Sequence, residues 1–149
     1  MTTLALESGY WGDIGHGIGA IILYALVGLV LMLVGFYAID VTTPGPLRKL
    51  IAVGNPNAVI VTASGMLSMA LIVVLAIYSS GGRLVEGLIS SAIYGLVGIA
   101  AQAISVRFLE WVLRLDIGEL LHSEHYSVRS LMVAAAHVAL GLVVAFAIL

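Results

Sequence analysis

The chain has 149 residues, of which 62% are hydrophobic and 9% are charged, and its net charge is −2. A soluble domain carries about 25% charged residues, so this composition excludes a water-soluble globular protein and predicts an all-α membrane protein. The charge gives no footprint for nucleic acid, and the lack of cysteine excludes disulfides and thiolate metal sites.

Residues 1–17 are predicted to form an external N-terminal tail. They lack the basic segment of a cleaved signal peptide, so we expect them to be retained. The glycines Gly12, Gly15 and Gly17 suit a flexible, close-packing approach to the first span. Tyr10 and Trp11 fit an aromatic belt at the outer surface.

Four runs without Asp, Glu, Lys or Arg predict four transmembrane helices, at residues 18–39, 58–78, 87–106 and 131–149. At about 1.5 Å per residue, each run reaches roughly 28–33 Å as a helix, which matches a hydrocarbon core of about 30 Å. Backbone polar groups in lipid must be paired within their own segment, so helices are the expected form.

The connection at residues 40–57 is predicted to contain a short amphipathic helix. Pro46 can open this helix and Gly54 can close it, with apolar residues such as Leu47 on one face and Arg48 on another. Asn55 followed by proline is typical of a helix cap, which here opens the second span.

The connection at residues 107–130 is predicted to contain a second such helix, because Asp116 and Glu119 have capping-box spacing ahead of Leu120 and Leu121. Glu119 and His122 also have the spacing used in di-iron bundles. The spans supply no further carboxylates, so we expect no metal site.

The basic residues predict the orientation in the membrane. Of the six, only Arg83 lies in the short connection at residues 79–86, and five lie in or beside the other two connections. The positive-inside rule makes the connections at residues 40–57 and 107–130 cytoplasmic and the one at 79–86 external. Both termini are then expected outside.

An internal duplication is predicted from an ungapped offset of 70 residues. The offset aligns Tyr24 with Tyr94, Gly17 with Gly87 and Asp40 with Glu110. It divides the chain into two hairpin repeats, residues 18–78 and 87–149, each with a short cytoplasmic helix. Two crossings per repeat make the repeats parallel, related by an axis along the membrane normal.

The stretch "GFYAIDVTTPGPLRKLIAVGNPNAVIVTASG" resembles the bacterial membrane family called domain of unknown function 350. The resemblance runs from residue 18 to the end and is carried by Gly35, Asp40, Thr43-Pro44, Asn57-Ala58 and Gly65. The second hairpin has Glu110, Arg114, Ser127-Val128 and Ala135 at the equivalent places. The resemblance implies four helices in a bacterial plasma membrane and no established activity. If Asp40 and Asn57 carry a shared function, only the first repeat has kept the residues for it.

His137 is the only ionisable side chain of the last predicted span, about 15 Å deep. An intramembrane ionisable group suggests a functional site, but a neutral imidazole hydrogen-bonded across a helix interface is the favoured interpretation. Ser64, Ser68 and Gln102 are expected near the same depth and could form one polar cluster with His137. Asp40 and Glu110 are expected as interfacial acids paired with nearby bases, or alternatively as a cation-binding pair at a cytoplasmic mouth.

Small residues recur at a spacing of four on three of the spans, as on helix-packing faces. These positions are Gly87, Ser91 and Gly95, then Ser64 and Ser68, and finally His137, Gly141 and Ala145. Four helices in one monomer do not obviously need all three faces, so we expect a homo-oligomer.

Two functional hypotheses follow. The favoured one is a non-enzymatic, self-associating scaffold or accessory subunit of the plasma membrane, with a possible cytoplasmic protein partner. The alternative is a channel or transporter for a small solute or ion, with a polar midplane site around His137. No catalytic residues and no cofactor are expected: a six-coordinate haem needs two ligands at one depth, whereas His16 lies near the outer surface.

Overall fold

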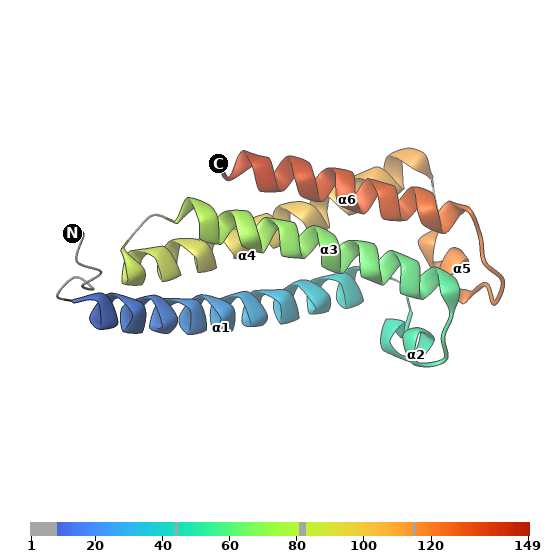
Figure 1. The fold of residues 1–149 in the computed structure, drawn as a ribbon. Helices are drawn as coiled ribbons and strands as arrows, with labels where there is room; N and C mark the ends of the chain where they lie inside the picture. The colour runs from blue at the N-terminus through green and yellow to red at the C-terminus, as the bar shows by residue number, and fades with distance from the viewer. Residues whose placement is uncertain (1–8, 44, 81–82, 115) are drawn as a thin grey trace, which may run out of the picture.

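The computed structural model describes residues 9–43, 45–80, 83–114 and 116–149, and within these ranges the chain is helical without strands (Figure 1). The helices are α1 (Tyr10–Thr42), α2 (Leu47–Ala52), α3 (Pro56–Ser79), α4 (Leu84–Leu113), α5 (Ile117–His122) and α6 (Arg129–Ala147). Four of them, α1, α3, α4 and α6, are long and apolar enough to cross a membrane, which confirms the predicted all-α membrane class.

The four long helices form a bundle in which α3 is central. It packs against α1, α4 and α6, while α1 and α6 lie on opposite sides of the bundle (Figure 1). The short helices α2 and α5 lie at one end, which we call the connection end. The start of α1 and the end of α6 lie at the opposite end (Figure 1).

Two of the long helices extend beyond the predicted spans. α1 begins at Tyr10, so residues 10–17 are helical rather than a loose tail, and residues 1–8 of that predicted tail lie outside the described residues. α4 continues to Leu113, well past residue 106. Helical hydrogen bonding does not stop where charged residues begin, and Arg107 pairs with Glu110 one turn further along α4.

The predicted helix caps are present at the connection end. The Asn55 side chain accepts hydrogen bonds from the backbone N–H groups of Asn57 and Ala58 and so caps α3. Asp116 caps α5 by accepting from the Glu119 N–H at 2.9 Å. Capping pairs backbone donors that a helix end leaves free, so these bonds stabilise the starts of α3 and α5.

The short helices turn their apolar sides into the protein. Leu47 of α2 is fully buried, as is Leu121 of α5. Arg48 and Lys49, on the other side of α2, are exposed. The predicted amphipathic faces are therefore present, and they pack on the bundle itself.

The small-residue faces are used within the chain. A Cβ on Gly87 of α4 would overlap the Tyr24 hydroxyl of α1, and one on Gly95 would overlap Leu31. Gly141 of α6 is equally close to the Ser68 hydroxyl of α3. Because one monomer occupies all three faces, they give no argument for association between copies, contrary to what we expected from the sequence.

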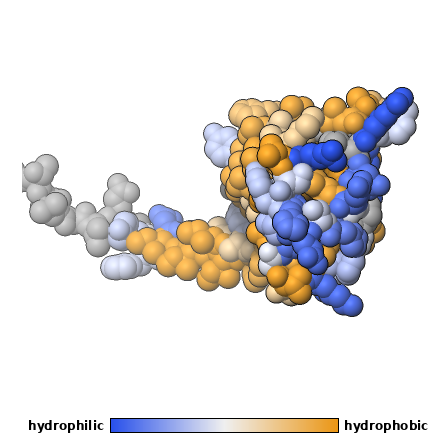
Figure 2. Space-filling view, turned by 90° about the vertical axis from the view of Figure 1, so that its right-hand side faces the viewer, coloured by the Kyte–Doolittle hydropathy of each residue, from blue (hydrophilic) through white to orange (hydrophobic). Residues whose placement is uncertain are grey.

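The first half of α1 has few partners. All the buried residues of this helix, Leu31, Gly35 and Ile39, lie in its second half. Figure 2, which looks onto the connection end, shows polar side chains gathered there, apolar side chains around the sides, and one apolar helix standing away from the body. α1 thus exposes a long apolar surface outside its own bundle.

Candidate functional site

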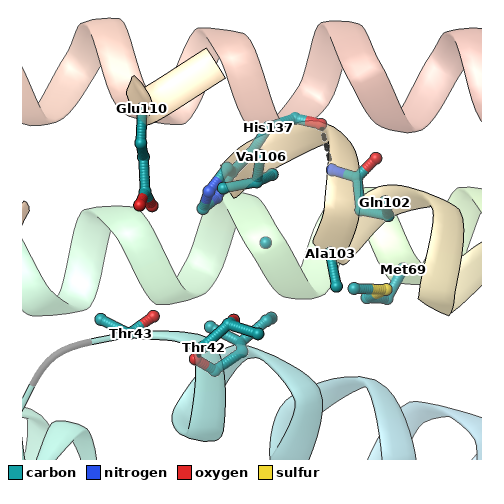
Figure 3. A pocket seen from close by; sticks show the side chains of 10 residues that line it. Thr42, Thr43, Met69, Gln102, Ala103, Val106, Glu110 and His137 are labelled. Atoms are coloured by element: carbon teal, nitrogen blue, oxygen red, sulfur yellow. Dashed lines mark hydrogen bonds between the residues drawn. The ribbon is translucent and has the colours of Figure 1, made fainter. Parts of the chain in front are cut away.

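The predicted polar cluster is assembled at the junction of α3, α4 and α6. The Nδ1 atom of buried His137 lies 3.3 Å from the Ser64 hydroxyl oxygen. The Gln102 amide nitrogen donates to the His137 backbone oxygen at 2.9 Å (Figure 3). Ser68 lies one turn further along α3, fully buried against Gly141. Three helices therefore contribute polar side chains to one point of the bundle.

The Ser64 hydroxyl oxygen lies between the His137 ring and the Val61 carbonyl group, 3.3 Å from Nδ1 and 2.8 Å from the carbonyl oxygen. The tautomer of the ring decides whether Nδ1 or the hydroxyl donates in the first of these bonds. In a neutral ring one nitrogen carries a proton and the other a lone pair, so the His137 imidazole can both donate and accept inside the membrane-spanning bundle.

A small cavity adjoins this cluster and extends toward the connection end. Glu110 and His137 both line it, and Figure 3 shows their side chains directed into the same space. Its volume is about 20 Å³, and a second space of about 10 Å³ beside it is also lined by Glu110 and His137. The first is large enough for about one water molecule. Its lining residues are Ile39, Thr42, Thr43, Gly65, Met69, Gln102, Ala103, Val106, Glu110 and His137.

The meeting of Glu110 with His137 follows from helix direction. Side chains on a helix tilt toward its N-terminus. α4 runs toward the connection end (Figure 1). The Glu110 side chain is therefore expected to tilt back into the membrane-spanning part of the bundle. α6 runs the opposite way, so His137 tilts toward the connection end. The two side chains converge, although the sequence predicts that they lie at different depths.

Two buried oxygen atoms in this region have no hydrogen-bond partner among the described residues. They are the amide oxygen of Gln102, a residue that lines the cavity, and the hydroxyl oxygen of Ser68. A buried polar atom without a partner costs about 1–3 kcal/mol. Such atoms are retained where a water molecule or an ion completes their hydrogen bonding.

The two predicted interfacial acids differ in position. Glu110 is mostly buried, pairs with Arg107 and lines the cavity. Asp40 lies 3.9 Å from Arg48, whose guanidinium group stacks over the Tyr37 ring at 4.7 Å. Asp40 is not among the described residues that line the cavity. The structure therefore brings Glu110, and not Asp40, to the polar cluster.

Asn57, the remaining candidate residue, joins the two hairpins. Its buried amide donates to the carbonyl oxygens of Leu120, Ser123 and His125, and its oxygen accepts from the Ser127 N–H at 2.9 Å. Asn55 adds bonds from its own amide to the carbonyl oxygens of Leu121 and Ser123. Sequence reasoning recognised Asn55 only as a cap, because its partners lie 66 and 68 residues away.

His122, of the Glu119–His122 pair, packs against neighbouring backbone. The His122 ring lies against Gly45, and its Nδ1 atom is 2.7 Å from the Gly118 carbonyl oxygen. The described residues contain no group of three or more His, Asp or Glu side chains placed to hold a metal ion.

The comparison with known proteins places this chain in a family. A family model described as Domain of Unknown Function (DUF350) matches residues 13–148. The chain belongs to this family. The match confirms the predicted resemblance and begins before residue 18, so it includes the early turns of α1.

Two mycobacterial relatives are described as UPF0719 transmembrane proteins. The one from Mycolicibacterium paratuberculosis (strain ATCC BAA-968 / K-10) is 34% identical over 133 residues, which cover 89% of this chain and 88% of the relative. The one from Mycobacterium bovis (strain ATCC BAA-935 / AF2122/97) is 41% identical over 81 residues, which cover 54% and 53%. No solved structure matches the chain. The DUF350 chain is thus a transmembrane protein with bacterial relatives.

Proposed function

We propose that this protein is a non-enzymatic membrane subunit that binds and conducts protons through the site formed by Glu110 and His137. The observation that carries the proposal is that these two side chains, from antiparallel helices, line one cavity. A carboxylate and an imidazole are the side chains that most readily exchange protons with water.

The size of the cavity favours the proton over larger solutes. A space of about 20 Å³ admits one water molecule, and a water molecule can relay a proton between Glu110 and His137. Beyond His137, Ser64 and the unpartnered hydroxyl of Ser68 continue the series of polar groups into the bundle. This develops the ion-pathway hypothesis drawn from the sequence.

The charge distribution supports a plasma-membrane orientation with the cavity near the cytoplasmic surface. Five of the six basic residues lie toward the connection end: two in α2, one in the last two turns of α4, one just after α4 and one at the start of α6. Arg83 precedes α4 at the opposite end. The positive-inside rule then places the connection end in the cytoplasm and both termini outside.

Proton flux into liposomes tests the proposal. Purified protein is reconstituted with an internal pH-sensitive dye, and a potassium gradient with valinomycin drives protons across the membrane. We expect flux well above that of protein-free liposomes, and its loss in Glu110→Gln and in His137→Leu. Flux equal to that of protein-free liposomes in the wild type would refute the proposal.

Two variants serve as controls for this assay. Asp40→Asn removes an acid of the same helix-end type that does not line the cavity. His16→Ala removes a histidine on the exposed first half of α1. Both should conduct like the wild type, so equal losses in all four variants would indicate general damage to the fold.

A second candidate function is the scaffold or accessory subunit. It is favoured by the polar surface of the connection end (Figure 2). There α2 exposes Arg48 and Lys49, while Leu47 is buried. A cytoplasmic partner docked there should co-purify with the wild type and be lost from the Arg48→Glu/Lys49→Glu variant. Retention of the same partner by that variant would exclude this surface.

A further inference from the structure

The two hairpins, α1–α3 and α4–α6, pack side by side in the same direction (Figure 1). A two-fold axis between them would turn the α3–α4 contact into an equal contact between α6 and α1. The described residues make no extensive contact between α1 and α6, which lie on opposite sides of the bundle. The second hairpin is therefore displaced sideways, and a displaced repeat leaves one packing face of each hairpin unused.

One contact between the hairpins involves two residues whose equivalents in the other repeat do not touch each other. Tyr24 of α1 lies over Gly87 of α4 and is 3.3 Å from the Ser80 hydroxyl. In the alignment of the two repeats, with its offset of 70 residues, Tyr24 is equivalent to Tyr94 and Gly87 is equivalent to Gly17. Tyr94 is 43% exposed, and no described atom lies within 4 Å of a Cβ placed on Gly17. The chain thus carries a second tyrosine and a second glycine that do not meet each other.

A second contact between the hairpins also lacks its equivalent. Ile72 of α3 lies against Gly98 of α4, where an added Cβ would overlap the Ile72 side chain. With the same offset of 70 residues, Leu142 is equivalent to Ile72 and Gly28 is equivalent to Gly98. Leu142 is exposed, and the nearest neighbour of Gly28 is Val73 of its own hairpin, at an ordinary contact distance of 3.6 Å. α4 is therefore packed between α3 and α6, whereas α1 lacks a helix on the equivalent side.

The unused faces differ from the intrachain junction in polarity. The polar cluster residues Ser64, Ser68, Gln102 and His137 correspond to Ala134, Val138, Met32 and Leu67. All four equivalents are apolar, so lipid can cover them in a single copy without leaving a polar group unpaired. A single chain can therefore insert alone and associate afterwards.

We propose that copies of this chain associate head to tail in the membrane. Tyr94 and Leu142, on the second hairpin of one copy, pack against Gly17 and Gly28 on α1 of the next. The occupant is a second copy because the unused face of α1 is the sequence equivalent of the α4 face that the first hairpin already covers. Such a contact joins different surfaces of the two partners and closes into a ring where its rotation permits.

Cross-linking tests this arrangement directly, because the chain has no cysteine of its own. The Tyr24→Cys/Gly87→Cys variant is used first, to find a short bifunctional thiol reagent that cross-links these two positions within one chain. Chains with Tyr94→Cys and chains with Gly17→Cys are then reconstituted separately and as a mixture. We expect intermolecular dimers in the mixture alone. Dimers in either single variant by itself, or none in the mixture, would overturn the head-to-tail contact.

Particle mass gives a second, independent measurement. Gly17→Leu should obstruct the contact and reduce polymer-extracted membrane particles to single chains, whereas the wild type should remain associated. Gly12→Leu is the matched control, because Gly12 also has no described atom within 4 Å but has no place in the proposed contact. Equal particle masses for the two variants would contradict the proposal, whatever the outcome of the proton-flux assay.

Discussion

At the scale of single residues, Asn57 holds together segments that are far apart in the sequence. Its fully buried side chain pairs with three carbonyl groups and one N–H of α5 and the segment that follows it. Asn57→Ala should destabilise the protein by about 3 kcal/mol, because all four of these hydrogen bonds are lost and the Leu120 carbonyl and the Ser127 N–H lose their side-chain partner. Thermal unfolding in detergent micelles measures this loss.

Ser127→Ala is the matched control for that change. Asn57 accepts from the backbone N–H of Ser127, which alanine also provides. We expect this variant to unfold within a few degrees of the wild type. Equal unfolding temperatures for Asn57→Ala and Ser127→Ala would show that the amide does not hold the hairpins together.

A substitution at Gln102 distinguishes an effect on stability from an effect on proton flux. Gln102→Leu removes the bond to the His137 carbonyl but also removes the unpartnered amide oxygen. These effects oppose each other, so stability should change by less than about 1 kcal/mol. Proton flux should nevertheless fall, because one polar lining group of the cavity is lost. Unchanged flux at unchanged stability would remove Gln102 from the site.

At the scale of helices, the closest approach is between α3 and α6. Gly141→Ala places a Cβ onto the Ser68 hydroxyl and close to its backbone, so the helices must separate. We expect a loss of about 1–3 kcal/mol, measured by unfolding in detergent. Ser68→Gly in the same chain removes the two nearest atoms and should restore part of the loss.

Gly12→Ala shows the opposite case on α1. No described atom lies within 4 Å of a Cβ at that position, and alanine favours a helix over glycine. This variant should be as stable as the wild type or slightly more stable. A loss comparable to that of Gly141→Ala would mean that contact with Ser68 does not account for the effect of Gly141→Ala.

The helices could be predicted from sequence more reliably than their ends or the site. Backbone N–H and C=O groups in lipid must be hydrogen-bonded within the protein, so four apolar runs were sufficient to predict four membrane-spanning helices. The ends differ because the predicted spans contain only residues without formal charge, whereas α1 starts before Asp13 and α4 continues past Arg107. The approach of Glu110 to His137 depends on side-chain tilt in antiparallel neighbours, which a hydropathy pattern does not contain.

At the scale of the whole molecule, the placement of the hairpins could not be read from the sequence. The spans are apolar on most sides, so hydropathy does not select which helices become neighbours. Local shape does: Tyr24 fits Gly87, and Ile72 fits Gly98. The 70-residue offset identified Tyr24, Tyr94, Gly17 and Gly87 as related positions, but only the packing shows which of them meet.

The orientation of the molecule is tested by thiol labelling in intact bacteria. Lys49→Cys and Arg83→Cys place single exposed thiols at opposite ends of the bundle. A membrane-impermeant maleimide should label Arg83→Cys in intact cells and Lys49→Cys only after the membrane is opened. The reverse pattern would place the Glu110 cavity on the external side.

The Asn57 joint also has a consequence for biosynthesis. Its partners follow it by 63 to 70 residues, so the ribosome delivers Asn57 long before any group that can pair with it. The bonds between the two hairpins therefore form only after the α5–α6 segment has been synthesised. Until then the side-chain amides of Asn55 and Asn57 lack the carbonyl partners that they have in the finished protein.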